Sequence, residues 1–365
     1  MSWIGATVAA ALLGVAAVAY LFWYFRWEQR QTTGMAYYGR SLADRRALKR
    51  QIRMLSLPAI PVLRTLVAIS RSRQTMPVVD YDGVSGPPRV STPEVFARAR
   101  QYCPQPEDVF VATQMRCGTT WMQQVVYQIV TNGRGEFSEA GRTHLYAVSP
   151  WIEGVNSVSI SDAPVVGMRP TRLIKTHLPA SHCPYGAEAK YIYVARHPVS
   201  CFASIVDFNH SMLGPLLPPV ETMATWFTSD QMYWLPWPRH VDGWWRWSLE
   251  RANVLFVHFE EMKRDLGGVI DRVAVFLGVE LSEDERGLIA RKCSFAYMKE
   301  HEEVFEMAPP TMFSVSGGQF LRSGKETRDA DVTPAIRQRI LDYCRDSLRG
   351  RAYPAGRFYP DLTDS

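Results

Sequence analysis

Residue patterns that commonly bind metals are missing from this sequence. The 365 residues include only six cysteines and eight histidines, and none of them form an H-x-x-H or C-x-x-C pair. The spacing typical of zinc ligands is therefore absent. The cysteines also lack paired spacing, which indicates reduced thiols rather than a disulfide framework.

A strong excess of one charge is missing as well. Lysine and arginine total 41 against 36 acidic residues, which gives a formal net charge of +5. This mild positive charge suits an anionic ligand. The sequence has no basic stripe interleaved with stacking aromatic residues in a recognisable nucleic-acid-binding fold, so we expect no nucleic-acid partner. Hydrophobic residues make up 47% of the chain, which is enough for one large domain and an appendage.

The first 25 residues contain no charged side chain, and residues 4–25 are almost wholly apolar. As a helix this run would span about 33 Å, enough to cross a bilayer core of about 30 Å. The run is too long for a typical signal peptide, and no basic segment precedes it. We therefore expect residues 1–25 to form a retained, single-pass transmembrane helix.

Basic residues follow this anchor at once. Residues 26–73 contain eleven lysines and arginines and two acids, and the basic residues between Arg45 and Arg53 interleave with leucine and isoleucine. This pattern is typical of a helix on an anionic membrane surface, so residues 26–90 are predicted to be basic interfacial helices and a linker. Because positively charged flanks stay in the cytoplasm, we expect the domain formed by residues 91–365 to face the cytoplasm, with the membrane as a partner.

The most informative segment, residues 109–121, combines an apolar strand-like run, a short loop and the start of a helix. The loop ends in Gly118, Thr119 and Thr120. A helix that starts after such a loop points free backbone N–H groups at an anion, and its dipole favours the anion's charge. The loop lacks the first glycine and the lysine of the G-x-x-x-x-G-K-[ST] pattern, so an ATPase or kinase activity is not favoured.

Strand-like and helix-like segments alternate along the rest of the chain. We expect strands near residues 107–113, 172–176, 190–195 and 253–259, with helices near residues 119–131, 198–208 and 261–277. Such alternation predicts an α/β fold with a central parallel sheet flanked by helices on both faces. In open sheets of this kind, ligands bind at the carboxyl ends of the strands.

The phosphate-loop segment resembles the 5′-phosphosulfate loop of sulfotransferases, whose usual form is T-Y-P-K-S-G-T-T-W. The residues that match this form in register are Thr113, Gly118, Thr119, Thr120 and Trp121, and those that depart from it are Gln114, Met115, Arg116 and Cys117. Arg116 stands where the family has its catalytic lysine. It keeps the positive charge, but it is bulkier and cannot lose its proton.

Further segments follow in the order seen in the cytosolic-type sulfotransferases. One supplies Lys175 and His177, which alternate along a strand and so point to one side of it. Another places Arg196 eight residues before Ser204, and the family uses an arginine and a serine at this separation to hold the 3′-phosphate of its nucleotide.

Two more matches lie further along the chain. A glycine-rich segment resembles the family's R-K-G loop, with Arg322 and Gly324 kept and Ser323 in place of the lysine. Phe295 matches the aromatic residue that, together with the counterpart of Trp121, sandwiches the adenine.

This resemblance implies a P-loop-like, three-layer domain that uses 3′-phosphoadenosine 5′-phosphosulfate (PAPS) as co-substrate and no metal. His177 would be the general base, while Lys175 and Arg116 would neutralise the charge that grows during in-line transfer of the sulfuryl group. The residues that would bind the nucleotide are Arg116, Cys117, Gly118, Thr119, Thr120, Trp121, Arg196, Ser204, Phe295, Arg322, Ser323 and Gly324.

The acceptor is the least defined part of this prediction. Residues 207–247 are dense in large apolar side chains, which would partly pack in the core and partly line an apolar pocket. With a membrane anchor, this favours a lipophilic alcohol or phenol, with an amine as the other acceptor group. Two alternatives stay open: a carbohydrate sulfotransferase facing a lumen or periplasm, and a nucleotide-binding membrane protein without transferase activity, which the changes at Arg116 and Ser323 would suit.

Overall fold

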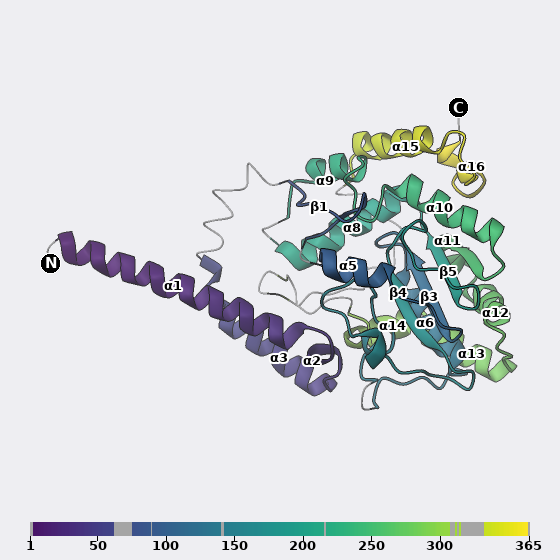
Figure 1. Cartoon of the computed structure of the whole chain (residues 1–365), viewed down its shortest axis with the longest axis horizontal. Helices are drawn as coiled ribbons and strands as arrows, with labels where there is room; N and C mark the ends of the chain where they lie inside the picture. The colour runs from purple at the N-terminus through teal and green to yellow at the C-terminus, as the bar shows by residue number, and fades with distance from the viewer. Residues whose placement is uncertain are drawn as a thin grey trace.

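The computed structural model describes residues 3–61, 75–88, 90–139, 142–214, 217–306, 311, 314 and 332–363. Figure 1 shows an α/β body from which a long N-terminal helix projects. The C-terminal helices lie on the body, away from the projecting helix.

A four-stranded parallel sheet forms the centre of the body. Its strands lie in the order β4-β3-β5-β6, with the bounds β3 (Asp108–Thr113), β4 (Arg172–Thr176), β5 (Lys190–Ala195) and β6 (Val254–His258). All three pairings are parallel, and parallel neighbours need crossover connections, which helices provide here. Each strand begins and ends within one residue of its predicted limits, and the predicted parallel sheet is confirmed.

Alternate residues of β3 enter two separate cores. Val109 and Val111 pack with α6 (Thr119–Val130), α12 (Leu266–Leu277) and α13 (Glu283–Lys292). Phe110 and Ala112 pack on the other face, with α8 (Pro198–Leu213), α10 (Trp237–Glu250) and α15 (Pro334–Leu348). Because successive side chains of a strand point to opposite faces, helices cover both faces, which gives the expected three layers.

Shorter elements connect these layers, and local signals in the sequence set several of their ends. Ser282 and Glu285 form the capping box that opens α13, and Thr333 caps α15 directly before a proline. The remaining elements of the body are β1 (Val79–Asp80), β2 (Ser85–Gly86), α5 (Pro93–Arg100), α7 (Leu145–Val148), η2 (Ile160–Asp162), α9 (Val220–Phe227), α11 (Phe259–Arg264), α14 (Phe295–Glu300), η4 (Glu302–Val304), α16 (Ala355–Phe358) and η6 (Pro360–Leu362).

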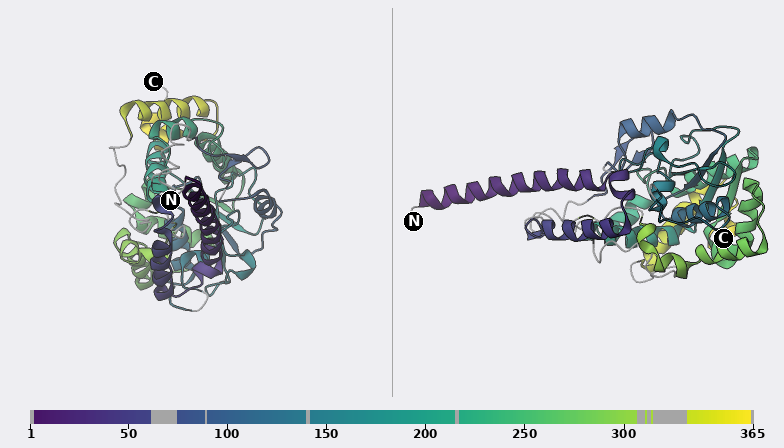
Figure 2. Two further views of the ribbon diagram at one scale, coloured as in Figure 1. Left: turned by 90° about the vertical axis from the view of Figure 1, so that its left-hand side faces the viewer. Right: turned by 90° about the horizontal axis from the view of Figure 1, so that it is seen from below.

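The N-terminal region is a helical hairpin. The long helix α1 (Trp3–Thr32) is followed by the short α2 (Met35–Tyr38) and by α3 (Leu42–Ser56), which runs back beside α1 (Figure 2). The Tyr20 hydroxyl donates to the Leu55 carbonyl at 2.5 Å and joins the two long helices. Among the described helices, the part of α1 from Thr7 onward is long and apolar enough to cross a membrane, by length and composition.

The basic helix α3 does not present all of its charges to one surface. Arg45 is buried, Arg46 pairs with Glu303, and Lys49 pairs with Glu306 of the body. Arg50 and Arg53, in contrast, are exposed. The placement of this helix on a membrane surface stays a prediction, and its first three basic residues contact the body, Arg45 through main-chain carbonyls and Arg46 and Lys49 through acidic side chains.

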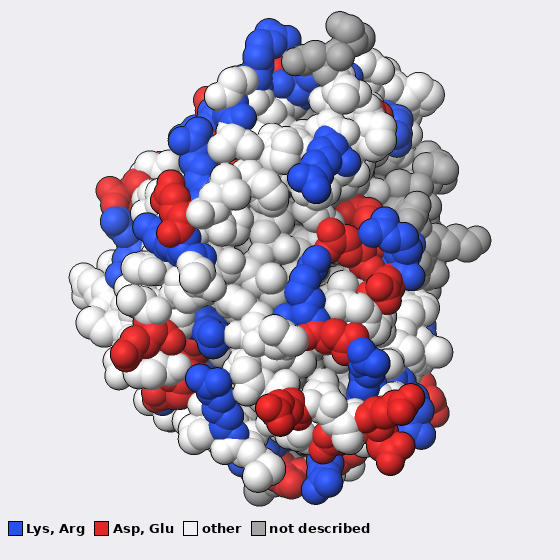
Figure 3. All heavy atoms as spheres, turned by 90° about the vertical axis from the view of Figure 1, so that its right-hand side faces the viewer, with Lys and Arg blue, Asp and Glu red and all other residues white. Residues whose placement is uncertain are grey.

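The face of the body opposite the projecting helix carries charges of both signs. Figure 3 shows basic and acidic side chains interspersed over this face. Ion pairs such as Arg272 with Glu261, at 2.6 Å, join neighbouring helices at the surface. This mixture agrees with the mild net charge of the chain.

Asp108, the first residue of β3, joins that strand to the preceding turn and to β4. Its carboxylate accepts hydrogen bonds from the Tyr102 hydroxyl, the Gln105 backbone N–H and the Arg172 guanidinium at 2.7, 2.7 and 3.0 Å, and its side chain is fully buried. Loss of one partner of a buried ion pair leaves the other uncompensated. We expect Asp108→Ala to lower the free energy of unfolding by about 3 kcal/mol, measured by urea titration in detergent.

Glu107 provides the matched control, because it pairs with the same arginine from a partly exposed position. Glu107→Ala should change the free energy of unfolding by about 1 kcal/mol or less. Equal losses in the two variants would contradict the anchoring role of Asp108.

Candidate active site

The loop between β3 and α6 has the geometry of an anion-binding turn. Gly118 caps α6 with a φ of 99°, a left-handed conformation that glycine adopts without strain. A Cβ atom at Gly118 would also lie 2.7 Å from the Phe259 ring. Thr119 and Thr120 form the first turn of α6, where backbone N–H groups lack partners within the helix.

His177 lies directly after β4 and beside this loop. Its Nδ1 is 2.9 Å from the main-chain carbonyl of Thr113, and because a carbonyl only accepts, Nδ1 must carry the proton. The Nε2 atom is then left with its lone pair, as a base requires. Burial, followed by the nearby Lys175, holds the pKa of His177 well below its usual value, so the ring is neutral at pH 7.

Residues outside every recognised motif hold the main chain of His177. The Glu153 carboxylate accepts from the His177 backbone N–H at 2.5 Å and from the Thr176 hydroxyl at 2.9 Å. The His240 Nε2 donates to the His177 carbonyl at 3.0 Å, and its Nδ1 accepts from the Tyr193 hydroxyl at 2.8 Å. Neither Glu153 nor His240 was predicted as a site residue, because their contacts with His177 join distant segments of the chain.

Lys175 is fully buried beside the same histidine. Its ammonium lies 4.2 Å from the centre of the Trp151 ring and 3.4 Å from the Tyr146 hydroxyl. The Tyr146 hydroxyl also lies 3.1 Å from the Thr120 hydroxyl and so connects Lys175 to the phosphate loop. Burial lowers the pKa of Lys175 and raises that of the neighbouring Glu153.

Arg116, Arg196 and Ser204 lie together, as their motifs predict. The Arg116 Nε donates to the Ser204 hydroxyl at 3.3 Å, and Arg196 donates to the Arg116 carbonyl at 2.9 Å. Burial and the neighbouring Arg196 lower the pKa of Arg116 to about 10. The Arg196 Nε is buried and has no hydrogen-bond partner among the described residues. Two neighbouring guanidiniums, that of Arg116 partly buried and that of Arg196 buried with an unsatisfied donor, suit an anionic ligand.

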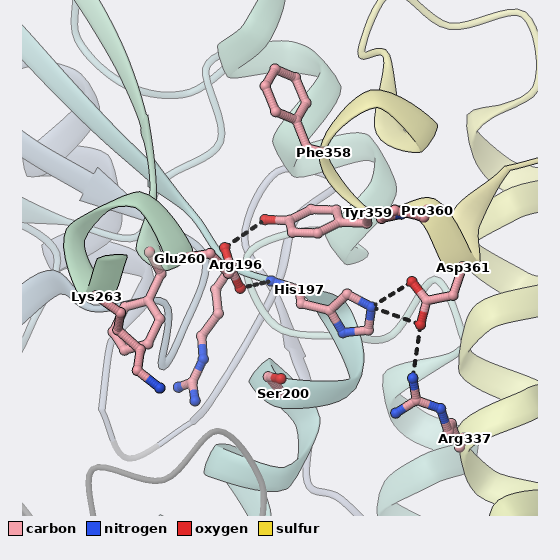
Figure 4. Close-up of a pocket in the computed structure, with 11 residues that line it drawn as sticks. Arg196, His197, Ser200, Glu260, Lys263, Arg337, Phe358, Tyr359, Pro360 and Asp361 are labelled. Atoms are coloured by element: carbon pink, nitrogen blue, oxygen red, sulfur yellow. Dashed lines mark hydrogen bonds and ion pairs between the residues drawn. The ribbon is translucent and has the colours of Figure 1, made fainter. Parts of the chain in front are cut away.

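A cavity of about 440 Å³ opens beside Arg196. Figure 4 shows the Arg196 guanidinium and Lys263 on one side of it, and His197 and Arg337 on the other. Asp361 bridges His197 and Arg337 at 3.0 and 2.8 Å. Basic side chains from three regions therefore line this cavity: the N-terminal end of α8, α11 and α15.

The remaining predicted nucleotide contacts fall into three groups. Trp121 donates to the Cys293 carbonyl at 2.7 Å, and the ring of Phe295 is 42% exposed two residues further on, where a flat ligand could reach it. Cys117 is fully buried 3.7 Å from the Cys201 sulfur, and burial raises the pKa of its thiol, so it fills space rather than acting as a thiolate. Residues 322–324, the predicted Arg322, Ser323 and Gly324 loop, lie outside the described residues.

Aromatic residues surround the base on the acceptor side. The Trp151 and Trp234 rings lie 5.2 and 6.5 Å from the His177 ring, centre to centre. Trp234 and Leu235 have φ angles of 64° and 77°, and the Gln114 amide holds this strained turn by donating to the Leu235 carbonyl at 2.6 Å. Trp234 is fully buried, and it belongs to the same core cluster as most of the other large residues predicted here, including Trp244.

The described part of the chain contains no group of three or more His, Cys, Asp and Glu side chains that could hold a metal ion. The groups available for chemistry are a neutral imidazole with a free lone pair, cationic side chains, and the backbone N–H groups of the first turn of α6. This combination suits the transfer of an anionic group to an acceptor whose proton the imidazole removes.

Comparisons with known proteins agree with this geometry. Residues 106–351 match the sulfotransferase domain family. Sulfotransferase 1C2 of Rattus norvegicus is 29% identical over 261 residues, which cover 69% of this chain and 86% of that protein. The 3-alpha-hydroxysteroid sulfotransferase of Cavia porcellus is 26% identical over 249 residues, covering 67% and 84%.

Solved structures share the fold. A mouse sulfotransferase complexed with PAP superposes with a TM-score of 0.57 at 21% identity, covering 75% of this chain and 94% of that one. Retinol dehydratase in complex with androsterone and the inactive cofactor PAP gives a TM-score of 0.60 at 23% identity, covering 76% and 92%. The family match spans 246 of the 365 residues, and the chain belongs to the sulfotransferase family.

Proposed function

We propose that this protein is a membrane-anchored sulfotransferase that moves a sulfuryl group from PAPS to the hydroxyl of a lipophilic acceptor. The observation that carries the proposal is the lone pair of His177, held beside Lys175 and next to the loop that ends at Gly118. The relatives named above support the donor, because two of the similar structures contain PAP, the bisphosphate that remains when PAPS loses its sulfuryl group.

Each side chain of the site has a role in this proposal. His177 takes the proton from the acceptor hydroxyl at Nε2. Lys175 and Arg116 offset the negative charge that grows as the bond to the donor phosphate lengthens. PAPS supplies the activated sulfuryl group, and the protein contributes positioning and charge, as in phosphoryl transfer.

The nucleotide assignment extends the same logic. Thr119, Thr120 and the N–H groups of the first turn of α6 would bind the 5′-phosphate, since helix N-termini favour anions. Arg196 and Ser204 would bind the 3′-phosphate, and the unsatisfied Arg196 Nε supports this role. Trp121 and Phe295 would stack on the adenine, with residues 322–324 and Cys117 completing the set by family resemblance.

The acceptor assignment rests on the aromatic walls. Trp151 and Trp234 flank His177, and they present apolar rings rather than the carboxylates and amides that bind sugars. A steroid sulfotransferase and an androsterone-bound structure among the relatives support the same acceptor class. A lipophilic alcohol or phenol is therefore favoured over a carbohydrate.

Transfer with the wild-type chain is the direct test. We expect a ³⁵S-labelled donor and a membrane lipid extract to yield a labelled lipid, identified by mass spectrometry as a sulfate ester. His177→Ala should lower turnover about 10²–10⁴-fold while keeping its affinity for adenosine 3′,5′-bisphosphate, measured by isothermal titration.

His301→Ala is the matched control, because His301 is an exposed histidine to which no role in the site is assigned. This variant should keep the wild-type turnover and the wild-type affinity for adenosine 3′,5′-bisphosphate. Tight bisphosphate binding by the wild type without transfer to any acceptor would instead favour a binding protein, and near wild-type turnover in His177→Ala would remove His177 as the base.

The pH dependence follows from the two shifted groups. Neutral His177 is needed, and because its pKa lies well below the usual value of 6.5, kcat/KM should fall only well below pH 6.5. Protonated Lys175 is needed, and its lowered pKa moves the alkaline limb below the usual 10.5. Lys175→Arg, which stays protonated, should remove the alkaline limb. An acid limb above pH 6.5 would contradict the assignment.

The membrane orientation also belongs to the proposal. We propose that α1 crosses the membrane once and that the residues after it face the cytoplasm, which the exposed basic residues Arg50 and Arg53 support. A reporter active only in the cytoplasm should work when fused after Ser365 and fail when fused before Met1. The reverse pattern would favour a lumenal or periplasmic enzyme.

A further inference from the structure

The juxtamembrane helices α2 and α3 are fastened to the catalytic body. The Thr143 hydroxyl donates to the Tyr38 carbonyl at 2.7 Å, and Arg45 donates to the Thr143 carbonyl at 3.1 Å. The backbone N–H of Gly34 donates to the Asn156 carbonyl at 3.0 Å. α2 accordingly lies where the N-terminal hairpin meets the body (Figure 1).

Charged contacts also attach α2 and α3 to the body at residues 303–306. Glu306 is buried, and its carboxylate accepts from the Tyr37 hydroxyl at 3.0 Å and pairs with Lys49. Arg46 pairs with Glu303 at 2.5 Å. Partly buried charge pairs of this kind hold two elements in one register.

The apolar side of the attachment reaches the candidate active site. Tyr37 and Tyr38 share one buried cluster with Leu145, Tyr146 and the partly buried Trp121. Trp121 belongs to the phosphate loop. A helix pair that sequence alone assigns to a membrane surface therefore forms part of the packing around the predicted nucleotide contacts.

Tyr146 is the link between the two regions. Its ring lies 5.7 Å from the Tyr38 ring, and its hydroxyl lies 3.1 Å from that of Thr120 and 3.4 Å from the Lys175 ammonium. His144, the cap of the same short helix, lies 4.8 Å from the Tyr38 ring. The Tyr38 ring therefore packs directly against the segment that places the Tyr146 hydroxyl.

We propose that Tyr38 of the juxtamembrane region is a positioning residue for sulfuryl transfer, and that it acts through Tyr146 on Lys175 and Thr120. The catalytic unit then begins near Gly34 rather than at residue 91. This inference rests on the proposed function, because Lys175 and Thr120 take their roles from it.

Two substitutions test the link in the full-length chain in lipid nanodiscs. Tyr146→Phe keeps the ring and removes the hydroxyl, and Tyr38→Ala removes the ring that packs against it. We expect each to lower kcat about 10–100-fold, because small misplacements of catalytic groups have effects of this size. The affinity for adenosine 3′,5′-bisphosphate should fall about three- to tenfold, as for the loss of one hydrogen bond.

Two controls separate positioning from general loss of structure. Tyr38→Phe keeps the ring and should restore kcat to within about threefold of the wild type. Met54→Ala truncates an exposed side chain of α3 and should leave kcat and nucleotide affinity unchanged. Turnover is measured with the labelled donor and 1-naphthol as the probe acceptor, and Tyr146→Phe is checked for a wild-type thermal unfolding midpoint.

The outcomes distinguish the two proposals. Suppose that the wild type transfers sulfate, and that Tyr146→Phe and Tyr38→Ala both fold and keep kcat and affinity within twofold of the wild type. This inference is then overturned, while the proposed function stands. If the wild type binds no bisphosphate and transfers no label, the proposed function is overturned, and this inference with it. A loss of kcat in Tyr38→Ala that Tyr38→Phe restores supports the positioning role.

Discussion

The hydrogen bond from the His177 ring to the main-chain carbonyl of Thr113 connects the two halves of the site. Thr113 ends β3 and starts the phosphate loop, and its hydroxyl lies 2.6 Å from that of Thr119 on the far side of the loop. His177 follows β4, the parallel neighbour of β3. Because parallel neighbours end at the same edge of a sheet, one residue can fix both the tautomer of the proposed base and the start of the proposed anion site. Any shift between the two strands would disturb both functions together.

The electrostatics of the site follow from burial. Lys175, Arg196 and His177 are almost inaccessible to solvent, and a low-dielectric environment penalises their charged forms. For the histidine this penalty is useful, since it keeps the ring neutral. For the cations it is costly unless an anion or a hydrogen-bonding carbonyl compensates. A nucleotide with two phosphate groups would supply that compensation, so its binding and the stability of the folded site are thermodynamically linked.

Sequence patterns predicted the frame of this structure well and its supporting contacts poorly. The four strands, and the proximity of Arg196 to Ser204, followed from periodicity and motif spacing. Tyr146, Glu153 and His240 were not predicted, because each acts through a partner between 24 and 63 residues away, and no local pattern marks such a contact. The contacts of α3 with the body were not predicted for the same reason. Its basic residues fit a membrane surface, but Glu303 and Glu306, more than 250 residues further on, face Arg46 and Lys49.

The residues that depart from the usual phosphosulfate loop form a consistent set. Arg116 has a φ of 62° and reaches Ser204 with its Nε, so the longer side chain finds a partner on α8 while its charge stays in the site. Cys117 occupies a fully buried position against Cys201, where a small residue is required. Gln114 replaces an aromatic residue and instead uses its amide to fix the turn that carries Trp234. These three changes therefore each have their own contact in this fold, and they leave the glycine and the two threonines at the start of α6 unchanged.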